Sequence, residues 1–414
     1  MKGKEPTVEV ALDGIAHGGE AVGRLPDGRA VFVGRAIPGE RVRIHVVESK
    51  KRWARAELVE VVDPSPDRVE PPCPYVPECG GCDLQHVAPV RQRAMKTRVV
   101  REQLERLGGI ESPPVDAIRA VGPDVRYRES ARFHAAADGR LGFLAAGSHD
   151  VVPIADCLVL HELPQLLREE VGDHTGASEV TVRAPGSGRV AVLHPGPGPL
   201  DIPEGGFDVA LAQPDGTVAP LRGDAILTST VAGFTYGYDA SCFFQVNPGG
   251  AEAIVEEVLA AVGAVGGRRV WDLYAGVGLL TLPLAASGAV VTAVEGHAPA
   301  TAWASRNAAD AGVDIEVVTA PVERFVSQVT RDPRDRRPDV VVLDPPRRGA
   351  GGDVVADLAT LAPDVIAYVA CDVAALARDA RTLTVNGYRL ARAVPLDLFP
   401  MTHHIEVIAR FVRT

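Results

Sequence analysis

The feature of this sequence that most constrains its fold is an alternation of strand-length apolar runs with helix-length segments, which begins near residue 240. The runs 269–274, 289–294, 339–344 and 365–370 each have the length and apolar content of a buried strand. Helix-like stretches separate them. An alternation of this kind is typical of a parallel sheet with helices on both faces. We therefore predict a doubly wound α/β domain over residues 236–414.

One cysteine stands at a strand end of this predicted sheet. Cys371 comes directly after the run 365–370, and a helix-like stretch begins behind it. In open α/β sheets, ligands bind at the carboxyl ends of the strands, and a helix N-terminus favours the thiolate form of a cysteine. Cys371 is therefore a candidate nucleophile. The alternative is a small buried apolar side chain, the commoner fate of an isolated cysteine.

Other strand ends carry residues suited to binding a ligand. Gly276 and Gly278 form a turn at which backbone can approach a ligand closely, and Glu295 can accept hydrogen bonds from ribose hydroxyls. Asp344 begins an Asp-Pro-Pro-Arg sequence at a further strand end. A dinucleotide-binding turn has a third glycine where this chain has Thr281. The turn therefore suits S-adenosylmethionine, which has no pyrophosphate, better than NAD.

Length and charge set the outer limits of the interpretation. A chain of 414 residues is long enough for two or three domains. The formal net charge of −11 argues mildly against nucleic-acid binding, but segments 41–55 and 91–106 each contain six Lys or Arg. No apolar stretch reaches the roughly 18–20 residues of a membrane span, and residues 1–6 do not lead into a signal-peptide core. We expect a cytoplasmic protein with no membrane partner.

The N-terminal segment, residues 1–63, is predicted to be a small all-β unit. Strand-like runs separated by Gly and Asp-Gly turns occupy most of it. The stretch 14–23 and the sequence Pro-Gly-Glu at 38–40 resemble the TRAM module, a small barrel that binds RNA. Basic residues at 50–55 surround Trp53, which suits phosphate contact and base stacking. A solvated hairpin with a half-buried tryptophan is the alternative.

Three cysteines lie close together after a proline-rich linker. Cys73, Cys79 and Cys82 have the spacing C-x5-C-x2-C, which in a cytosolic chain indicates metal ligation rather than disulfides. An iron–sulfur cluster takes four thiolates, and Cys157 is the natural fourth. Zinc is the alternative, with His86 completing a Cys3His site.

The rest of the predicted central domain, residues 64–235, has a coarser pattern. Residues 90–107 are predicted to be a helix with its basic residues largely on one face, and strands begin near residue 127. The Gly- and Pro-rich segment 184–206 is predicted to be a loop.

Together, these motifs resemble the RNA 5-methyluridine methyltransferase family over nearly the whole chain. The shared signatures are the TRAM-like start, the cysteine spacing, Phe-Phe-Gln-Val-Asn at 243–247, the glycine turn at 272–278, Asp-Pro-Pro-Arg at 344–347, and the segment 397–406. The resemblance is strongest to the iron–sulfur branch that acts on 23S ribosomal RNA. It implies a class I methyltransferase domain behind the barrel and a central α+β iron–sulfur domain.

The resemblance also implies a mechanism and a set of site residues. Cys371 would add to C6 of uracil, C5 would take the methyl group, and Glu406 would remove the C5 proton. Gln245, Tyr274, Glu295 and Asp344, with Gly276 and Gly278, would hold S-adenosylmethionine or the uracil. Within this family the ligands of a [4Fe–4S] cluster correspond to Cys73, Cys79, Cys82 and Cys157, with His86 not a ligand. The expected partner is RNA, ribosomal in preference to transfer RNA, and the protein is expected to be a monomer.

Three positions depart from the family's pattern. Asp372 stands where the residue after the nucleophile is usually Asn, and Leu279 stands where an Asn often contacts the cofactor. The family's Thr-Gly-His-Val-Glu reads Thr-His-His-Ile-Glu, and we expect His403 and His404 to be loop side chains rather than catalysts. The alternatives are an RNA-binding iron–sulfur protein or RNA-folding factor with a relict transferase site, and a transfer RNA uracil-5-methyltransferase.

Overall fold

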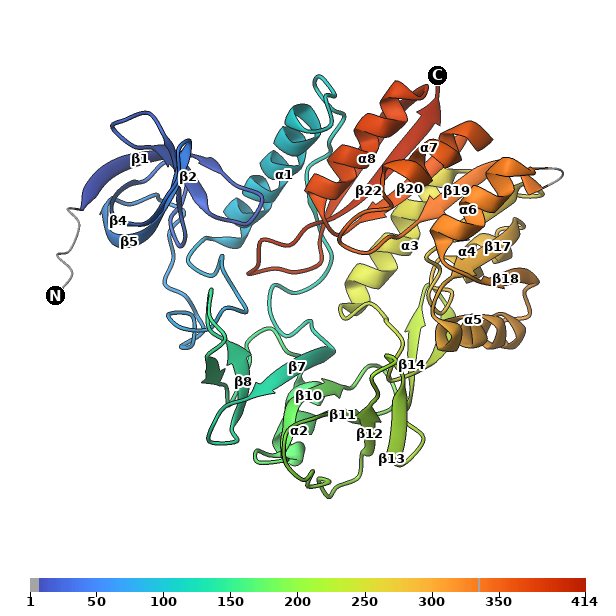
Figure 1. Cartoon of the computed structure of the whole chain (residues 1–414), viewed down its shortest axis with the longest axis horizontal. Helices are drawn as coiled ribbons and strands as arrows, with labels where there is room; N and C mark the ends of the chain where they lie inside the picture. Colours follow the sequence, from blue (N-terminus) through green and yellow to red (C-terminus); the bar gives the residue numbers. More distant parts are fainter. Residues whose placement is uncertain (1–6, 334–335) are drawn as a thin grey trace.

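The structure is a computed structural model that describes residues 7–333 and 336–414, and it has three parts (Figure 1). The first is a closed barrel with the strand order β1-β2-β3-β5-β4. Its strands are β1 (Val8–Ile15), β2 (Ala21–Arg24), β3 (Ala30–Val33), β4 (Arg41–Ser49) and β5 (Trp53–Asp63). The first six residues of the predicted N-terminal domain lie outside the described residues.

Along the barrel strands, alternate side chains point inward and form a small apolar core. Val10 and Leu12 of β1 point inward with Val31, Val42 and Ile44, as a half-buried strand pattern predicts. The basic residues of segment 41–55 are partly neutralised by acidic partners on other strands. These ion pairs are Arg41 with Glu9, Arg43 with Glu60, and Arg55 with Glu20.

The second part is a seven-stranded sheet with the order β13-β12-β11-β10-β7-β8-β9, with helix α2 (Glu162–Val171) packed against β10 and β11. Its strands are β7 (Ser130–Ala135), β8 (Leu141–Leu144), β9 (Val151–Pro153), β10 (Ala177–Arg183), β11 (Val190–Pro195), β12 (Asp208–Ala212) and β13 (Val218–Arg222). A hairpin of β14 (Ile226–Val231) and β15 (Phe234–Asp239) follows.

Strand β11 contradicts the predicted loop at 184–206. Residues 190–193 are buried and pair with β10 on one side and β12 on the other. The flanking glycines and prolines dominate the local pattern, whereas the strand is held by partners from elsewhere in the chain. The prediction was wrong because pairing, not local composition, decides a short central strand.

The third part is an eight-stranded sheet with the order β18-β17-β16-β19-β20-β22-β21-β6. Its strands are β6 (Arg119–Ala120), β16 (Arg269–Leu273), β17 (Val290–Glu295), β18 (Ile315–Thr319), β19 (Val340–Leu343), β20 (Val365–Ala370), β21 (Tyr388–Asp397) and β22 (Glu406–Arg413). Its helices are α1 (Pro89–Arg106), α3 (Pro248–Val262), α4 (Thr281–Ala286), α5 (Ala298–Asp310), α6 (Val322–Arg331), α7 (Gly352–Leu361) and α8 (Val373–Val385).

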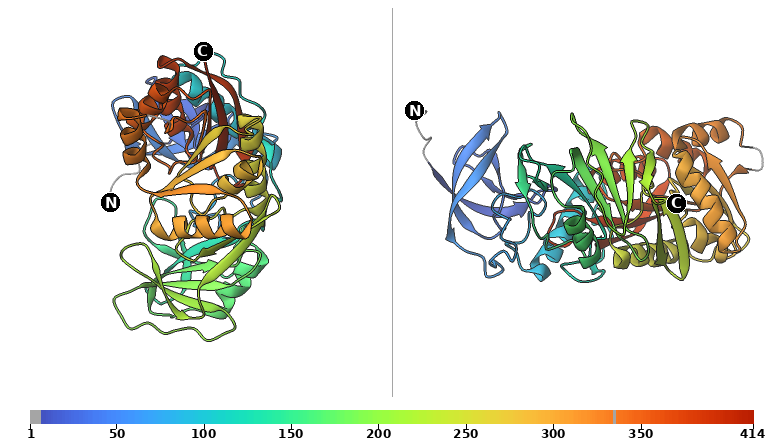
Figure 2. Two further views of the ribbon diagram at one scale, coloured as in Figure 1. Left: turned by 90° about the vertical axis from the view of Figure 1, so that its right-hand side faces the viewer. Right: turned by 90° about the horizontal axis from the view of Figure 1, so that it is seen from below.

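Helices cover this sheet as the sequence pattern predicts. Strands β19 and β20 are buried along their whole length, as expected for parallel strands covered on both faces. The barrel lies at one end of the molecule and the helices α4 to α6 at the other (Figure 2). Asn247 caps α3 through its side chain, with Pro248 in the first helical position. No helix among the described residues is long and apolar enough to cross a membrane.

Two elements of the predicted central segment pack on the third part. Helix α1 contacts α8 and β21, and β6 pairs in parallel with β21. The segment 64–235 therefore contributes to both the second and the third parts, and the domain boundaries at 63 and 235 stay a prediction.

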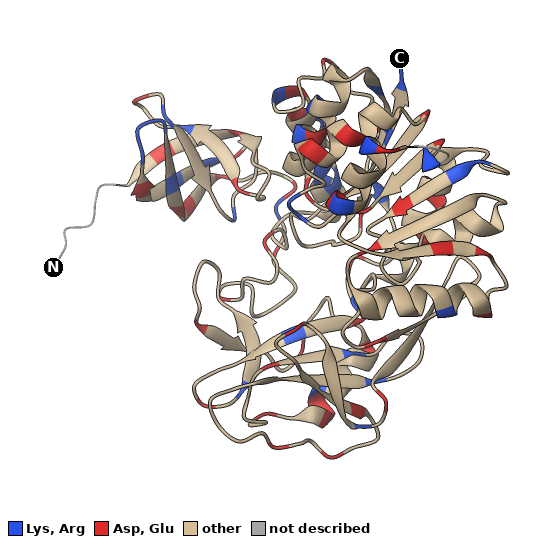
Figure 3. Ribbon diagram, turned by 45° about the vertical axis from the view of Figure 1, so that its right-hand side comes forward, with Lys and Arg blue, Asp and Glu red and all other residues tan. Residues whose placement is uncertain are grey.

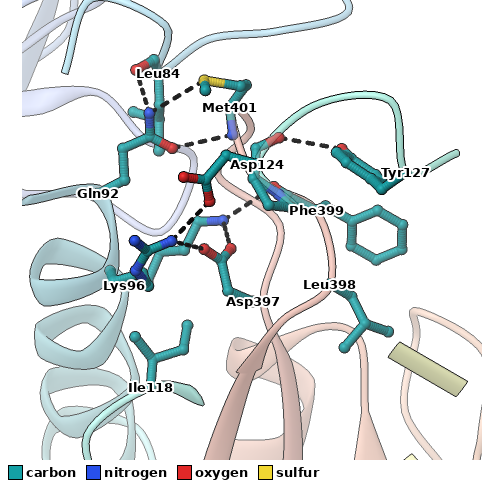
Figure 4. A network of polar contacts seen from close by, with 12 residues as sticks. Leu84, Gln92, Lys96, Ile118, Asp124, Tyr127, Asp397, Leu398, Phe399 and Met401 are labelled. Carbon is teal, nitrogen blue, oxygen red and sulfur yellow. Dashed lines mark hydrogen bonds and ion pairs between the residues drawn. The ribbon is translucent and has the colours of Figure 1, made fainter. Parts of the chain in front are cut away.

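A buried ion pair fastens α1 to the loop between β21 and β22 (Figure 4). The ammonium of Lys96 donates to Asp397 Oδ1 at 2.6 Å and to the carbonyl of Phe399 at 3.0 Å, and both charged side chains are almost fully buried. Burial lowers the pKa of Lys96, and the Asp397 carboxylate opposes that shift. The predicted basic face of this helix is therefore interrupted, because Lys96 points into the protein.

We predict that Lys96→Ala lowers the free energy of unfolding by about 3–5 kcal/mol, because it leaves the Asp397 charge buried without its closest partner. Urea denaturation followed by circular dichroism measures the change. Glu102→Ala, which removes the i,i+4 partner of Arg98 on the same helix, is the control and should cost less than about 0.5 kcal/mol. Equal losses for the two variants would contradict a structural role for the buried pair.

Candidate active site

The sheet order places a crevice where the chain reverses direction. Strands β16 and β19 are neighbours, and the chain runs outward from them in both directions, which is the usual place for a ligand in an open α/β sheet. A cavity of about 680 Å³ lies at the carboxyl ends of these strands. Seven of the eight predicted catalytic and cofactor-binding residues line it: Gln245, Tyr274, Gly276, Glu295, Asp344, Cys371 and Glu406.

Gly278 is the predicted residue that does not line this cavity. Its φ is +98°, and a Cβ there would lie 2.9 Å from the Leu282 side chain. Gly278 therefore shapes the turn between β16 and α4, where a side chain has no room, and does not face the crevice.

Strand pairing brings Cys371 and Glu406 together. Strands β20 and β22 are antiparallel, and Ala370 is opposite Val407. Cys371 follows Ala370 and Glu406 precedes Val407, so the two residues are neighbours at the same end of the pair. Glu406 is 3% exposed, and its Oε1 atom has no hydrogen-bond partner among the described residues. An unpaired buried carboxyl oxygen that lines a cavity is suited to a substrate or a proton.

The electrostatics of Cys371 differ from the sequence expectation. Burial, together with the neighbouring carboxyls of Glu406 and Asp344, raises the pKa of the thiol to about 12, and the Arg347 guanidinium opposes the shift. The expectation that the helix N-terminus favours the thiolate form of Cys371 is therefore wrong. The helix N-terminus is occupied by Asp372, whose Oδ1 accepts a hydrogen bond from the Ala375 amide at 2.7 Å.

Buried carboxyls crowd the floor of the crevice. Burial raises the pKa of Glu406 well above its usual range, and the charge of Asp344 adds to the shift while Arg347 opposes it. Burial and the charge of Asp272 raise the pKa of Asp344 to about 7. Carboxyls that cannot all be ionised together can exchange protons with a bound substrate near neutral pH.

The turn after β16 presents backbone to the crevice. Tyr274 has a φ of +63°, which is rare for a bulky side chain, and Gly276 has a φ of +56° with open space where a Cβ would lie. The Glu295 carboxylate accepts hydrogen bonds from the Gly276 amide at 3.1 Å and from the His297 amide at 2.7 Å. Glu295 therefore holds the glycine turn while it also faces the cavity.

Among the residues that line the cavity without having been predicted as site residues are Phe243, Arg347 and His404. Phe243 is 70% exposed, which is unusual for an aromatic residue in a folded domain. Burial lowers the pKa of His404 to about 4, so its ring is neutral near pH 7. His404 was expected to be a loop side chain. Its place two residues before Glu406 was the signal that could have found it.

The four cysteines predicted as cluster ligands also line one cavity, of about 250 Å³, although Cys157 is far from the other three in the sequence. All four are free thiols. Burial raises the pKa of Cys82 to about 12. Among the described residues, no three Cys, His, Asp or Glu side chains converge closely enough to hold a metal ion as they stand.

His86, the alternative zinc ligand, faces away from this cavity. Its ring is buried, and its Nε2 atom lies 3.5 Å from the carbonyl of Ala36 in the barrel. Burial lowers the pKa of His86 to about 4. The donors that surround the cavity are thus thiols, a set that suits iron–sulfur chemistry as well as zinc.

The buried carboxyl of Asp272 generates a pH prediction. Burial raises its pKa to about 7 from an ordinary value of 3.8. The folded protein therefore binds this proton more tightly than the unfolded chain, so its contribution to stability is full below pH 4 and is lost as the pH rises through 7. Asp272→Asn has no proton to lose. We predict that its free energy of unfolding increases relative to the parent protein between pH 4 and 7.

Urea titrations at pH 4, 5, 6, 7 and 8 measure this difference. Asp353→Asn changes an exposed carboxyl on α7 and serves as the control, with an expected difference that stays constant across the series. Parallel profiles for Asp272→Asn and the parent protein would show that Asp272 ionises normally in the folded state.

Comparisons with known sequences agree with this arrangement. The profile of the TRAM domain matches residues 1–59, and the profile described as tRNA (Uracil-5-)-methyltransferase matches residues 225–409. The chain is 36% identical over 426 residues to an uncharacterized RNA methyltransferase of Streptomyces avermitilis, covering 97% of each. It is 35% identical over 432 residues to the 23S rRNA (uracil(1939)-C(5))-methyltransferase RlmD of Chromohalobacter salexigens, covering 98% of this chain and 89% of that protein.

A solved structure shares the whole fold. The tRNA (uracil-54, C5)-methyltransferase of Pyrococcus abyssi, crystallised with S-adenosyl-L-homocysteine, superposes with a TM-score of 0.74 over 98% of this chain and 99% of that chain, at 24% identity. Relatives above 30% identity that align over nearly the full length establish the family, and the architecture agrees with it. This chain belongs to the RNA uracil-5-methyltransferase family.

Proposed function

We propose that this protein transfers a methyl group from S-adenosylmethionine to C5 of a uridine in structured RNA, through a covalent bond between Cys371 and C6 of the base. The observation that carries the proposal is the pairing of β20 with β22, which sets a thiol and a buried carboxyl side by side in one cavity. A nucleophile beside a proton acceptor is what methylation of a carbon that is not itself nucleophilic requires.

The Cys371 thiol loses its proton to water, its sulfur bonds to C6, and the electrons of the C5–C6 double bond move toward O4. The methyl donor is a cosubstrate that leaves as S-adenosylhomocysteine once C5 has taken the methyl group. Glu406, which must be ionised at this step, then removes the C5 proton, the C5–C6 double bond forms again, and the sulfur departs and recovers that proton from Glu406.

The part of the cavity near the glycine turn fits the methyl donor. Open space at Gly276 allows backbone to lie against a ligand, and the acceptor-rich carboxylate of Glu295 is suited to ribose hydroxyls. We assign Tyr274 and Gln245 to this part or to the adjoining uracil subsite, with Asp344 between the two.

The part of the cavity near Cys371 fits a flipped pyrimidine. Phe243 offers an exposed ring at the cavity wall, which supplies a stacking surface for a base taken out of its helix. The neutral ring of His404 has one donor and one acceptor nitrogen, and Arg347 supplies donors for a carbonyl oxygen.

The barrel supplies the proposed RNA contact outside the catalytic cavity. Lys and Arg are interspersed with Asp and Glu over its strands (Figure 3). Lys51 and Arg52, at the β4–β5 turn, form no ion pair with another described residue and are exposed. Trp53 is half-buried against Phe32, with the Arg55 guanidinium over its ring. Lys51 and Arg52 are therefore the barrel residues best suited to contact RNA phosphates. Trp53 is less suited to stack on a base, because its ring is already covered in part by Phe32 and Arg55.

Ribosomal RNA is the proposed target, with transfer RNA as the alternative. Support for ribosomal RNA comes from the 35% identity to RlmD over 98% of this chain, whereas the transfer RNA enzyme of known structure is 24% identical. A relict site in an RNA-binding protein would have no reason to keep Cys371, Glu406 and five predicted binding residues around one cavity. Methylation assays with 23S ribosomal RNA fragments and with transfer RNA separate these targets.

We further propose that Cys73, Cys79, Cys82 and Cys157 hold a [4Fe–4S] cluster. The support is the gathering of four thiols around one cavity, with His86 turned away from it. The cluster would cross-link the segment 73–82 to Cys157 in the second part of the molecule. Its place outside the catalytic cavity favours a structural or RNA-binding role.

The mechanism predicts that Glu406→Gln traps a protein–RNA adduct. The variant should still allow attack by Cys371 and methyl transfer, but the adduct cannot eliminate because the C5 proton has no acceptor. A band that survives denaturing electrophoresis should accumulate when S-adenosylmethionine is present. The double variant with Cys371→Ala is the control and should give no band. Full activity of Glu406→Gln without an adduct would assign the base to another residue.

The cluster assignment predicts about four irons per chain in protein purified without oxygen. Cys82→Ser should lose most of this iron, and it should keep its affinity for S-adenosylmethionine because Cys82 does not line the catalytic cavity. Cys242→Ser, which changes a buried cysteine outside the cluster cavity, is the matched control and should keep its iron. Stoichiometric zinc without iron in the parent protein would refute the assignment.

A further inference from the structure

The turn between β1 and β2 of the barrel reaches the segments that carry Cys371 and Glu406. Residues 16–20 form this turn, closed by a hydrogen bond from the Gly19 amide to the Ala16 carbonyl at 3.0 Å. Ile15, at the end of β1, packs in the same apolar cluster as Leu84, Met95 and Ile405. The barrel is therefore docked against the catalytic domain at this point.

The first contact of the turn is with the residue that follows the nucleophile. His17 Nε2 lies 3.1 Å from Asp372 Oδ2, while Asp372 Oδ1 accepts from the Ala375 amide at the start of α8. Both oxygens of Asp372 are thus held from different sides, one by its own helix and one by the barrel. Asp372 bonds covalently to Cys371, so this contact restrains the backbone on one side of the reactive thiol.

The second contact is with the segment that precedes Glu406. A Cβ at Gly19 would lie 2.9 Å from the Cβ of His403, so the turn fits against this loop only with a glycine there. Gly19 has a φ of +83°, which also favours glycine. His403 Nδ1 in turn contacts the carboxylate of Asp83, next to Cys82.

We propose that His17, acting through Asp372, is a positioning residue for Cys371, and that Gly19 lets the same turn support the loop that leads to Glu406. This inference rests on the proposed function. The His17 and Asp372 side chains are 33% and 30% exposed, and a polar contact so open to solvent contributes little to stability. The role of the contact is therefore to hold position: it keeps the Cys371 thiol and the Glu406 carboxyl at fixed places relative to each other, at the ends of β20 and β22.

Two readouts in the full-length protein separate positioning from folding. The first is the rate at which iodoacetamide alkylates Cys371, followed by peptide mass mapping without RNA. His17→Ala should raise this rate several-fold, because the loosened turn exposes the thiol, and should leave the buried Cys242 unreactive. The second is methylation of the RNA substrate, in which kcat should fall about tenfold with the Kd for RNA unchanged.

Matched variants complete the test. His17→Gln keeps a donor toward Asp372 and should restore most of kcat, and His17→Ala should have no further effect in an Asp372→Ala background, where no side-chain partner for His17 is left. Gly19→Ala should lower kcat, whereas Gly18→Ala, whose added methyl group meets nothing within 4 Å, should not.

The proposal would be overturned if His17→Ala had the same alkylation rate at Cys371 and the same kcat as the parent protein. A weaker Kd for RNA with kcat unchanged would overturn it too, because that result makes the turn an RNA contact. Equal acceleration at Cys371 and Cys242 would also overturn it, since it indicates a general loss of the fold. If the parent protein methylates no uridine, the proposed function fails, and the alkylation rates alone still decide whether His17 positions Cys371.

Discussion

The buried contact between Lys96 and Asp397 is the interaction on which the catalytic end of the molecule depends (Figure 4). The loop that follows Asp397 leads to Glu406, and it receives most of its support from side chains of other elements. Gln92 of α1 bonds to the backbone amide of Met401, and Asn247 bonds to the carbonyl of Leu398. A loop held in this way keeps a carboxyl in place without regular secondary structure of its own, at the cost of burying a charged pair.

The same loop joins parts of the chain that are far apart in sequence. The amides of Asp83 and Leu84, beside the cysteine segment, donate to the carbonyl of Met401. Tyr127, just before the central sheet, donates to the carbonyl of Pro400. The cysteine segment, the central sheet and the catalytic strands therefore meet at residues 399–403. These contacts connect the loop that leads to Glu406 with both the cysteine segment and the central sheet.

Burial sets the chemistry of the cavity as much as residue identity does. Burial raises the pKa values of both Cys371 and Glu406, so the cavity favours the neutral forms of these groups. In the proposed mechanism, the Cys371 thiol must therefore lose its proton before the sulfur bonds to the base. Arg347, at the wall of the cavity, is the cation whose charge lowers the pKa of both groups. A substrate that excludes water from the cavity would strengthen the electrostatic interactions of Arg347 with Cys371 and Glu406.

The sequence by itself determined the alternation of strands and helices and the cap at Asn247, because these follow from short-range periodicity. Strand-end motifs, together with the resemblance to a known family, supplied the seven predicted residues that line the cavity. Tertiary structure alone decided that Lys96 is buried, that residues 190–195 form a central strand, that His404 faces the cavity and that His17 reaches Asp372. Each of these depends on a partner tens to hundreds of residues away, and burial by such partners leaves no periodic trace in the local sequence.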